Sequence, residues 1–240
     1  MLTGVDLEVR PGEMFAIFGP SGVGKSVLLK TTIGLVRPDR GEVFFEGEPI
    51  YRSGARAMAA VRKEVGYVFQ HAALFDSMNV FDNVCMGIPE NELGGLSRIE
   101  QGRRVWRALD LVNLDPREVL SATPAELSGG MKKRVGIARA IIGTPRVLLW
   151  DEPTTGLDPI NTAAVERLIT DLSNRIEVTS VVVTHDIFGG LEICDRVAIL
   201  YDGVTRYIGE PAGFWSSEDP VIRAFLDRAA AGAAADMEVT

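Results

Sequence analysis

The sequence has few of the residues from which disulfide or metal frameworks are built. Two of its 240 residues are cysteine and two are histidine, and Cys85 and Cys194 belong to no CxxC or Cys/His cluster. Cysteines with this spacing are typical of small buried side chains in a reducing compartment. The pattern therefore argues against a disulfide-bonded fold and against a zinc-binding fold.

Long apolar runs and an excess of basic charge are missing as well. No apolar run approaches the roughly 20 residues that cross a bilayer, and the N-terminus has no charged-then-apolar signal segment. We therefore expect any membrane role to depend on a partner. The net charge is −8, from 33 acidic and 25 basic residues, whereas duplex binding draws on a broad basic face. We expect no nucleic-acid partner.

Short apolar runs alternate with helical patterns along the chain. This alternation predicts an α/β fold, a mostly parallel sheet with helices on both faces. The predicted strands are residues 14–18, 43–46, 65–69, 147–150, 180–184 and 197–201. The predicted helices are residues 25–34, 98–112, 131–142 and 162–174.

The length favours a single domain that includes an inserted subdomain. Residues 72–143 carry helical periodicity without a convincing strand, so we expect a helical subdomain there, inserted between core segments 1–71 and 144–215. Residues 216–240 are expected to form a C-terminal helix or tail. Its Ala/Gly-rich part after Asp227 is expected to fray or to dock on a partner.

The stretch GPSGVGKS follows the first predicted strand and opens the next predicted helix. It fits G-x-x-x-x-G-K-[ST] in the strand–loop–helix context that this phosphate-binding motif requires. Its backbone N–H groups would surround phosphate oxygens, Lys25 would contact the β- and γ-phosphates, and Ser26 would bind Mg²⁺. A glycine-rich turn with a surface lysine is the alternative, which the flanking elements disfavour. The predicted ATP-binding residues here are Gly19, Pro20, Ser21, Gly22, Val23, Gly24, Lys25 and Ser26.

A second acidic motif, VLLWDEP, ends another buried strand. Asp151 is predicted to be a partner of Mg²⁺, either directly or through another group, and Glu152 is predicted to orient and activate the attacking water. Asp151 could instead cap the following turn. That alternative is the weaker one beside a phosphate loop.

The stretch PAELSGGMKKR places a serine and two glycines before a long basic and apolar run. A helix N-cap explains the serine but not both glycines. Side chains larger than hydrogen would block an anion from approaching the helix N-terminus closely. The stretch therefore predicts that an anion docks at Ser128, Gly129 and Gly130.

Together these motifs resemble the nucleotide-binding subunit of ABC transporters over nearly the whole chain. The sequence also has GYVFQ with Gln70, GLDP with Asp158 and VVVTHD with His185, in family order and at family-like spacing. LSGG between the glutamine and the acidic strand is far more specific than the phosphate loop alone. The resemblance implies a RecA-like P-loop NTPase fold with a small antiparallel β portion, and ATP and Mg²⁺ as cofactors.

The resemblance further implies a homodimer of two head-to-tail copies. Each ATP would lie between the phosphate loop of one copy and the LSGG of the other. Gln70 would reach Mg²⁺ and the water, His185 the γ-phosphate, and Asp158 would couple the two sites. His71 matches no family role and is expected to be exposed. The implied catalytic residues are Glu152, His185 and Gln70, and the implied metal ligands are Ser26, Gln70 and Asp151.

Some details are similar to the ATPase of MCE-type (Mla) phospholipid transporters: HAALFDSMNVFDNV, Met131 after the signature, and the tail SSEDPVIRAFL. This similarity implies a transmembrane permease docking near residues 70–81, an MCE-domain lipid-binding protein in the complex, and a place on the cytoplasmic face of the inner membrane. Five apolar residues would line the permease groove, or else belong to an ordinary helical core: Leu74, Phe75, Met78, Val80 and Phe81.

Two other functions remain open. An importer ATPase for a small polar solute would share all the catalytic residues. A soluble non-transport ABC ATPase acting on DNA or ribosomes usually has tandem cassettes, a coiled-coil insertion or zinc cysteines, and this sequence has none of them.

Relatives have an additional strand before LTGVDLEVRPGE that carries an aromatic residue stacked on adenine. This sequence has no aromatic residue upstream of Phe15. Stacking on a base contributes about 1–3 kcal/mol in other settings. We therefore expect weak nucleotide affinity.

Overall fold

The computed structural model describes residues 2–237, with the side chains of 159 and 232–237 outside the description. Much of the Ala/Gly-rich tail that was predicted to fray or dock therefore lies beyond the described side chains. Its backbone up to residue 237 belongs to a helix, α11 (Pro220–Met237).

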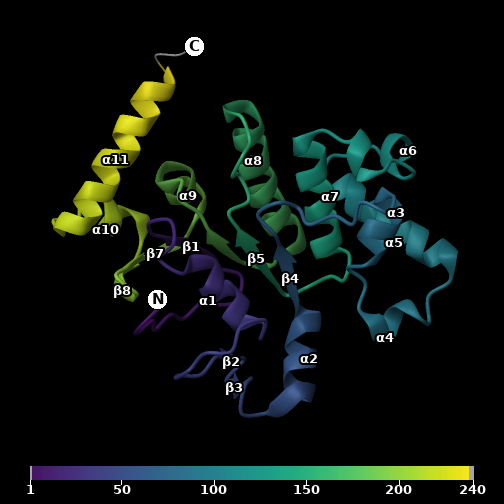
Figure 1. Cartoon of the computed structure of the whole chain (residues 1–240), viewed down its shortest axis with the longest axis horizontal. Coiled ribbons are helices and arrows are strands. Elements are labelled where there is room, and N and C mark those ends of the chain that lie inside the picture. The colour runs from purple at the N-terminus through teal and green to yellow at the C-terminus, as the bar shows by residue number, and fades with distance from the viewer. Residues whose placement is uncertain (1, 238–240) are drawn as a thin grey trace.

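A six-stranded sheet forms the centre of the fold (Figure 1), with the order β4-β5-β6-β1-β7-β8. All neighbouring strands are parallel except β7 and β8. The bounds are β1 (Met14–Phe18), β4 (Val65–Val68), β5 (Val147–Asp151), β6 (Thr179–Val183), β7 (Arg196–Tyr201) and β8 (Val204–Gly209). A separate antiparallel pair consists of β2 (Phe44–Phe45) and β3 (Glu48–Pro49). The predicted α/β class with a small antiparallel portion is confirmed.

The predicted strands agree with these bounds to within one residue at each end, and 43–46 loses one residue at both ends to give Phe44–Phe45. Strands β3 and β8 were not predicted. Strand β8 alternates exposed and half-buried residues at the sheet edge, so it lacks the continuous apolar run that marks a buried parallel strand.

Strand β1 is apolar on both faces because it separates two hydrophobic cores. Met14, Ala16 and Phe18 face the larger core, which also contains residues of α7, α8 and α9. Phe15 and Ile17 face the smaller core, which contains residues of α1. The period-2 alternation of a strand thus places helices on both sides of the sheet.

Eleven α-helices surround the sheet in the part of the chain described. Their bounds are α1 (Lys25–Thr32), α2 (Gly54–Glu64), α3 (Val80–Cys85), α4 (Glu90–Leu93), α5 (Arg98–Leu111), α6 (Pro116–Val119), α7 (Gly129–Ile141), α8 (Pro159–Ile176), α9 (Ile187–Ile193), α10 (Pro211–Trp215) and α11. The predicted helices correspond to α1, α5, α7 and α8. Helix α2 was missed because it buries only Val61, and α3, α4, α6, α9 and α10 are too short to show a periodic pattern.

The described chain between β4 and β5 contains helices and no strand. Helices α3, α5 and α7 pack around a common apolar centre that includes Val84, Val105, Leu109 and Val135, each fully buried. This segment lies at one end of the sheet, beside β4 and β5 (Figure 1). These apolar residues belong to the larger core, which continues to the sheet through Phe18 and Trp150, and the division into a helical subdomain 72–143 stays a prediction.

No helix in the described part of the chain combines the length and the apolar character needed to cross a membrane.

Candidate functional site

The phosphate loop connects β1 to α1 and curls around Lys25. Gly19, Gly22 and Gly24 have φ values of 151°, 81° and 109°, which favour glycine. A Cβ at Gly19 would lie 2.5 Å from the carbonyl oxygen of Leu200, so larger residues are excluded there. The Lys25 ammonium donates to the carbonyl oxygen of Gly19 at 2.8 Å and is almost buried.

Asp151 ends β5 and accepts two hydrogen bonds through its carboxylate. The Ser26 hydroxyl donates to Oδ1 at 2.6 Å, and the Tyr67 hydroxyl donates to Oδ2 at 2.7 Å. Burial and the neighbouring Asp151 carboxylate raise the pKa of Tyr67, so it remains a protonated donor. The hydroxyl, carboxylate and amide oxygens offered by Ser26, Asp151 and Gln70 are the hard ligands that Mg²⁺ prefers. The donor set therefore fits Mg²⁺.

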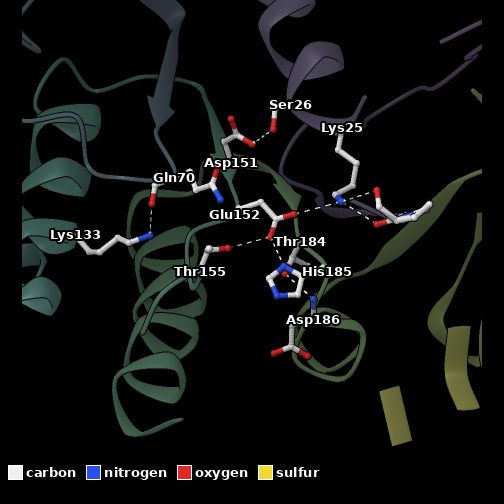
Figure 2. A network of polar contacts seen from close by, with 12 residues as sticks. Lys25, Ser26, Gln70, Lys133, Asp151, Glu152, Thr155, Thr184, His185 and Asp186 are labelled. Atoms are coloured by element: carbon white, nitrogen blue, oxygen red, sulfur yellow. Dashed lines mark hydrogen bonds and ion pairs between the residues drawn. The ribbon is translucent and has the colours of Figure 1, made fainter. Parts of the chain in front are cut away.

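Glu152 lies at the centre of the polar network in Figure 2. Its Oε1 lies 3.3 Å from the ammonium of Lys25, and its Oε2 lies 2.5 Å from Nδ1 of His185. The Thr155 hydroxyl also donates to Oε2, at 3.3 Å. The backbone of Glu152 has φ 50°, a conformation that non-glycine residues adopt only where the surroundings hold them. The site thus unites three predicted residues: Lys25, Glu152 and His185.

Gln70 follows β4, and its backbone carbonyl accepts a hydrogen bond from the ammonium of Lys133 at 2.5 Å. Lys133 comes from α7 and is 7% exposed. Burial lowers the pKa of Lys133, and the negative charge of Glu152 partly offsets this effect.

Sequence reasoning missed both Lys133 and Tyr67. Tyr67 lies three positions before Gln70, on a strand paired directly with β5. The pairing of β4 with β5 and the packing of α7 against the loop after β4 are tertiary contacts, so no local sequence pattern marked either residue.

Ser128 is the N-cap of α7, and its side chain accepts the N–H of Met131 at 3.3 Å. Both Ser128 and Gly129 are exposed, and a Cβ built at Gly129 would meet no atom within 4 Å. The N-terminus of this helix is therefore open to approach. Between residues 2 and 237, no described hydrogen bond or ion pair joins residues 128–130 to the phosphate loop.

Asp158 is the N-cap of α8 and accepts the N–H of Asn161 at 3.0 Å and its side-chain amide at 2.5 Å. These hydrogen bonds lower the pKa of Asp158. Asn161 also lies beside the signature, because a Cβ at Gly130 would lie 3.1 Å from its Oδ1. Asp158 and the signature are thus neighbours within one chain, as a second group of predicted residues.

Phe15 is fully buried, so it cannot stack on a base. The apolar neighbour of the phosphate loop is Leu2, because a Cβ at Gly24 would lie 2.9 Å from its Cδ2. Weak nucleotide affinity remains a prediction.

The five apolar residues of the expected permease groove differ in exposure. Val80 is fully buried in the core around α3, which agrees with the alternative of an ordinary helical core and not with a docking surface. Phe75 is 48% exposed, and the Arg98 guanidinium covers the ring of Phe81 at 4.0 Å from its centroid. His71 is exposed, as expected.

Known proteins have a similar sequence and a similar architecture. A family model described as ABC transporter matches residues 2–155. The chain is 44% identical over 199 residues to the methionine import ATP-binding protein MetN of Carboxydothermus hydrogenoformans, covering 83% of this chain and 58% of that protein. It is 38% identical over 223 residues to the probable ribonucleotide transport ATP-binding protein mkl of Mycobacterium leprae, covering 93% and 63%.

Among solved structures, the chain is similar to the dimeric ATP-binding cassette MJ0796 in a post-hydrolysis state bound to ADP and Pi. The TM-score is 0.77 at 31% identity, over 88% of this chain and 90% of that one. The chain belongs to the ABC transporter family, and its fold is that of the ATP-binding cassette. It spans 58% and 63% of the two curated relatives described above.

Proposed function

We propose that this chain is the ATP-hydrolysing motor subunit of an ABC transporter. Two copies would pack head to tail around two Mg-ATP, and their closing and reopening would drive a membrane permease. The observation that carries the proposal is the meeting of Lys25, Glu152 and His185 beside the Ser26–Asp151 hydrogen bond. A phosphate-binding cation, a general base and a metal-ligand pair are the parts that phosphoryl transfer to water requires.

In this mechanism Lys25 and the N–H groups of the phosphate loop hold the β- and γ-phosphates. Ser26, Asp151 and Gln70 would hold Mg²⁺, whose chemistry when bound is to neutralise charge on the phosphate oxygens. The Glu152 carboxylate orients the attacking water and accepts its proton. His185, fixed by its hydrogen bond to Glu152, would contact the γ-phosphate.

The second group of residues would complete the pocket of the partner copy. Ser128 and Gly129 are exposed at the N-terminus of a 13-residue helix, where backbone N–H groups favour an anion. Asp158, which lies beside them, would couple the two composite sites. Each chain then contributes to both ATP molecules.

For the cargo we propose phospholipid, with a transmembrane permease and an MCE-domain protein as partners at the cytoplasmic face of the inner membrane. The support is the similarity of HAALFDSMNVFDNV and Met131 to MCE-type ATPases. A small-solute importer is the second candidate, favoured by the 44% identity to a methionine import protein.

Co-purification from native membranes tests this proposal. The full chain, tagged at its C-terminus, would be isolated in mild detergent, and its membrane partners would be identified by mass spectrometry. We expect a permease together with an MCE-domain protein. A permease with a solute-binding protein would support the importer instead, and recovery with ribosomes or DNA alone would refute both.

A further inference from the structure

We propose that Lys133 is a positioning residue for ATP hydrolysis, which ties the signature helix to the loop that carries Gln70. When the Ser128 end of α7 docks on the partner's nucleotide, this contact would then set the positions of Gln70 and Glu152 in the same chain. This inference rests on the proposed function and assigns a role to a residue three positions after the LSGG signature.

The contact of Lys133 is unusual for a lysine. Its ammonium reaches the carbonyl oxygen of Gln70 at 2.5 Å, and the residue is 7% exposed. A buried ammonium needs hydrogen bonds and a compensating charge. The hydrogen bond to Gln70 supplies the first of these, and the negative charge of Glu152 offsets only part of the cost of burial. Figure 2 shows Lys133 pointing to the backbone of Gln70, with Glu152 next to them.

Other residues on the same face of α7 contact the loop that carries Gln70. Gly136 and Arg139 follow Lys133 at steps of three residues, a spacing that places side chains on one helix face. Arg139 donates to the carbonyl oxygens of Ala72 at 2.6 Å and Ala73 at 2.7 Å. A Cβ at Gly136 would lie 3.2 Å from Cα of Ala72. Residues 70–73 thus contact α7 at several positions.

The backbone of this loop depends on such contacts. Ala72 and Ala73 have φ values of 58° and 47°, which cost of order 1–3 kcal/mol each unless the surroundings compensate. Arg139 holds the far end of the loop, and Lys133 holds the end that carries Gln70.

The geometry of α7 makes it a direct link between the two groups of site residues. Ser128 caps the helix, and Lys133 follows five positions later, which is about 7–8 Å along the axis. A hydrogen-bonded helix moves as a unit over that length. A shift of Ser128 toward a phosphate would therefore displace the carbonyl of Gln70 in the same chain.

The test compares Lys133→Met, Lys133→Arg and Lys132→Met in the full chain. Lys132 is a matched control, because it is the same residue type on the same helix, is only partly buried, and has no side-chain hydrogen bond among the described residues. The readouts are kcat and KM for ATP, ATP-driven dimerisation of the chain, and the thermal midpoint.

We expect Lys133→Met to lower kcat by about 10–100-fold, the effect of small misplacements at reacting groups. KM and ATP-driven dimerisation should stay within about twofold, because the described contact of Lys133 is with the backbone of Gln70 and not with the phosphate loop or the signature. Lys133→Arg should recover most of kcat, and Lys132→Met should leave it unchanged.

An unchanged kcat in Lys133→Met would overturn the inference. A lower thermal midpoint, a higher KM and a lower kcat in Lys133→Met, with no recovery in Lys133→Arg, would overturn it as well. That pattern indicates a purely structural role. If wild type itself neither hydrolyses ATP nor dimerises with it, the proposed function fails and the inference falls with it.

Discussion

Two adjacent carboxylates in this site have different partners and therefore different roles. Asp151 accepts from the hydroxyls of Ser26 and Tyr67, whereas Glu152 contacts Lys25 and His185. The left-handed backbone of Glu152 turns its side chain away from the direction of the strand. The backbone thus separates the carboxylate proposed to bind the metal from the carboxylate proposed to activate the water.

The role of Glu152 predicts the behaviour of Glu152→Gln. The amide keeps the shape of the side chain but cannot accept the proton of the water, so ATP turnover should fall by about 10²–10⁴-fold. Nucleotide binding should persist, and the closed dimer should accumulate with ATP in size-exclusion chromatography. Unchanged turnover would remove Glu152 from the mechanism.

The hydrogen bond from Tyr67 to Asp151 predicts that Tyr67→Phe weakens Mg²⁺ binding. Loss of a partner that orients a metal ligand typically costs about 10–100-fold in metal affinity, so we expect the Mg²⁺ concentration for half-maximal hydrolysis to rise about tenfold.

Tyr51→Phe is the control for this prediction, because among the described residues the hydroxyl of Tyr51 bonds only the backbone carbonyls of Thr31 and Val36. Equal Mg²⁺ requirements in the two variants would show that Tyr67 does not orient the metal ligand.

Among the elements, α8 and α9 meet through a pair of carboxyl groups. A Cβ at Gly189 would lie 2.2 Å from Oε1 of Glu166 and 3.0 Å from Oδ2 of Asp186, so both groups face the same point. Burial, then the negative charges of Asp186 and Glu192, raise the pKa of Glu166 from 4.5 to about 7.

This pKa predicts how stability depends on pH. Between pH 4.5 and about 7 the folded chain keeps a proton on Glu166 that the unfolded chain releases, so stability falls as pH rises through this window and stays lower above it. Glu166→Gln removes the repulsion. Because the group is partly exposed, we expect a gain of only about 1 kcal/mol at pH 8, or about 2–4 °C in the thermal midpoint.

The comparison is between thermal midpoints of Glu166→Gln and wild type at pH 5 and pH 8. The advantage of the variant should shrink from pH 8 to pH 5, because at pH 5 the folded wild type keeps the proton on Glu166 and avoids the repulsion. An equal advantage at both pH values would contradict the assigned cause.

Individual elements also show how much of the fold and of the site could be predicted from the sequence. Strand β5 and the phosphate loop carry their signals locally, in a continuous apolar run and in fixed spacing, so their bounds and roles were predicted. Strand β8 has no such run, because it lies at the sheet edge. Tyr67 and Lys133 gain their roles from strand pairing and from a helix passing a loop, which are tertiary contacts that no local pattern records.

For the whole molecule, the described contacts form two groups of site residues. Lys25, Ser26, Asp151, Glu152 and His185 are joined by hydrogen bonds and ion pairs. In the second group, Asn161 donates a hydrogen bond to Asp158 and lies beside Gly130 of the exposed signature. In the proposed mechanism the chain encloses a nucleotide by offering its second group to another copy, and the similar dimeric cassette was solved bound to ADP and Pi.

The central claim, that each site is shared between two copies, is tested by ATP hydrolysis in defined heterodimers isolated with two different tags. One heterodimer pairs Lys25→Ala with Ser128→Arg. The control pairs a wild-type copy with a copy that carries both substitutions.

If sites are shared head to tail, the first heterodimer keeps one intact site and should hydrolyse ATP well above either parent homodimer, whereas the control has a defect in each site and should be nearly inactive. The reverse pattern, an inactive first heterodimer and an active control, would show that each chain completes its own site and would contradict the account.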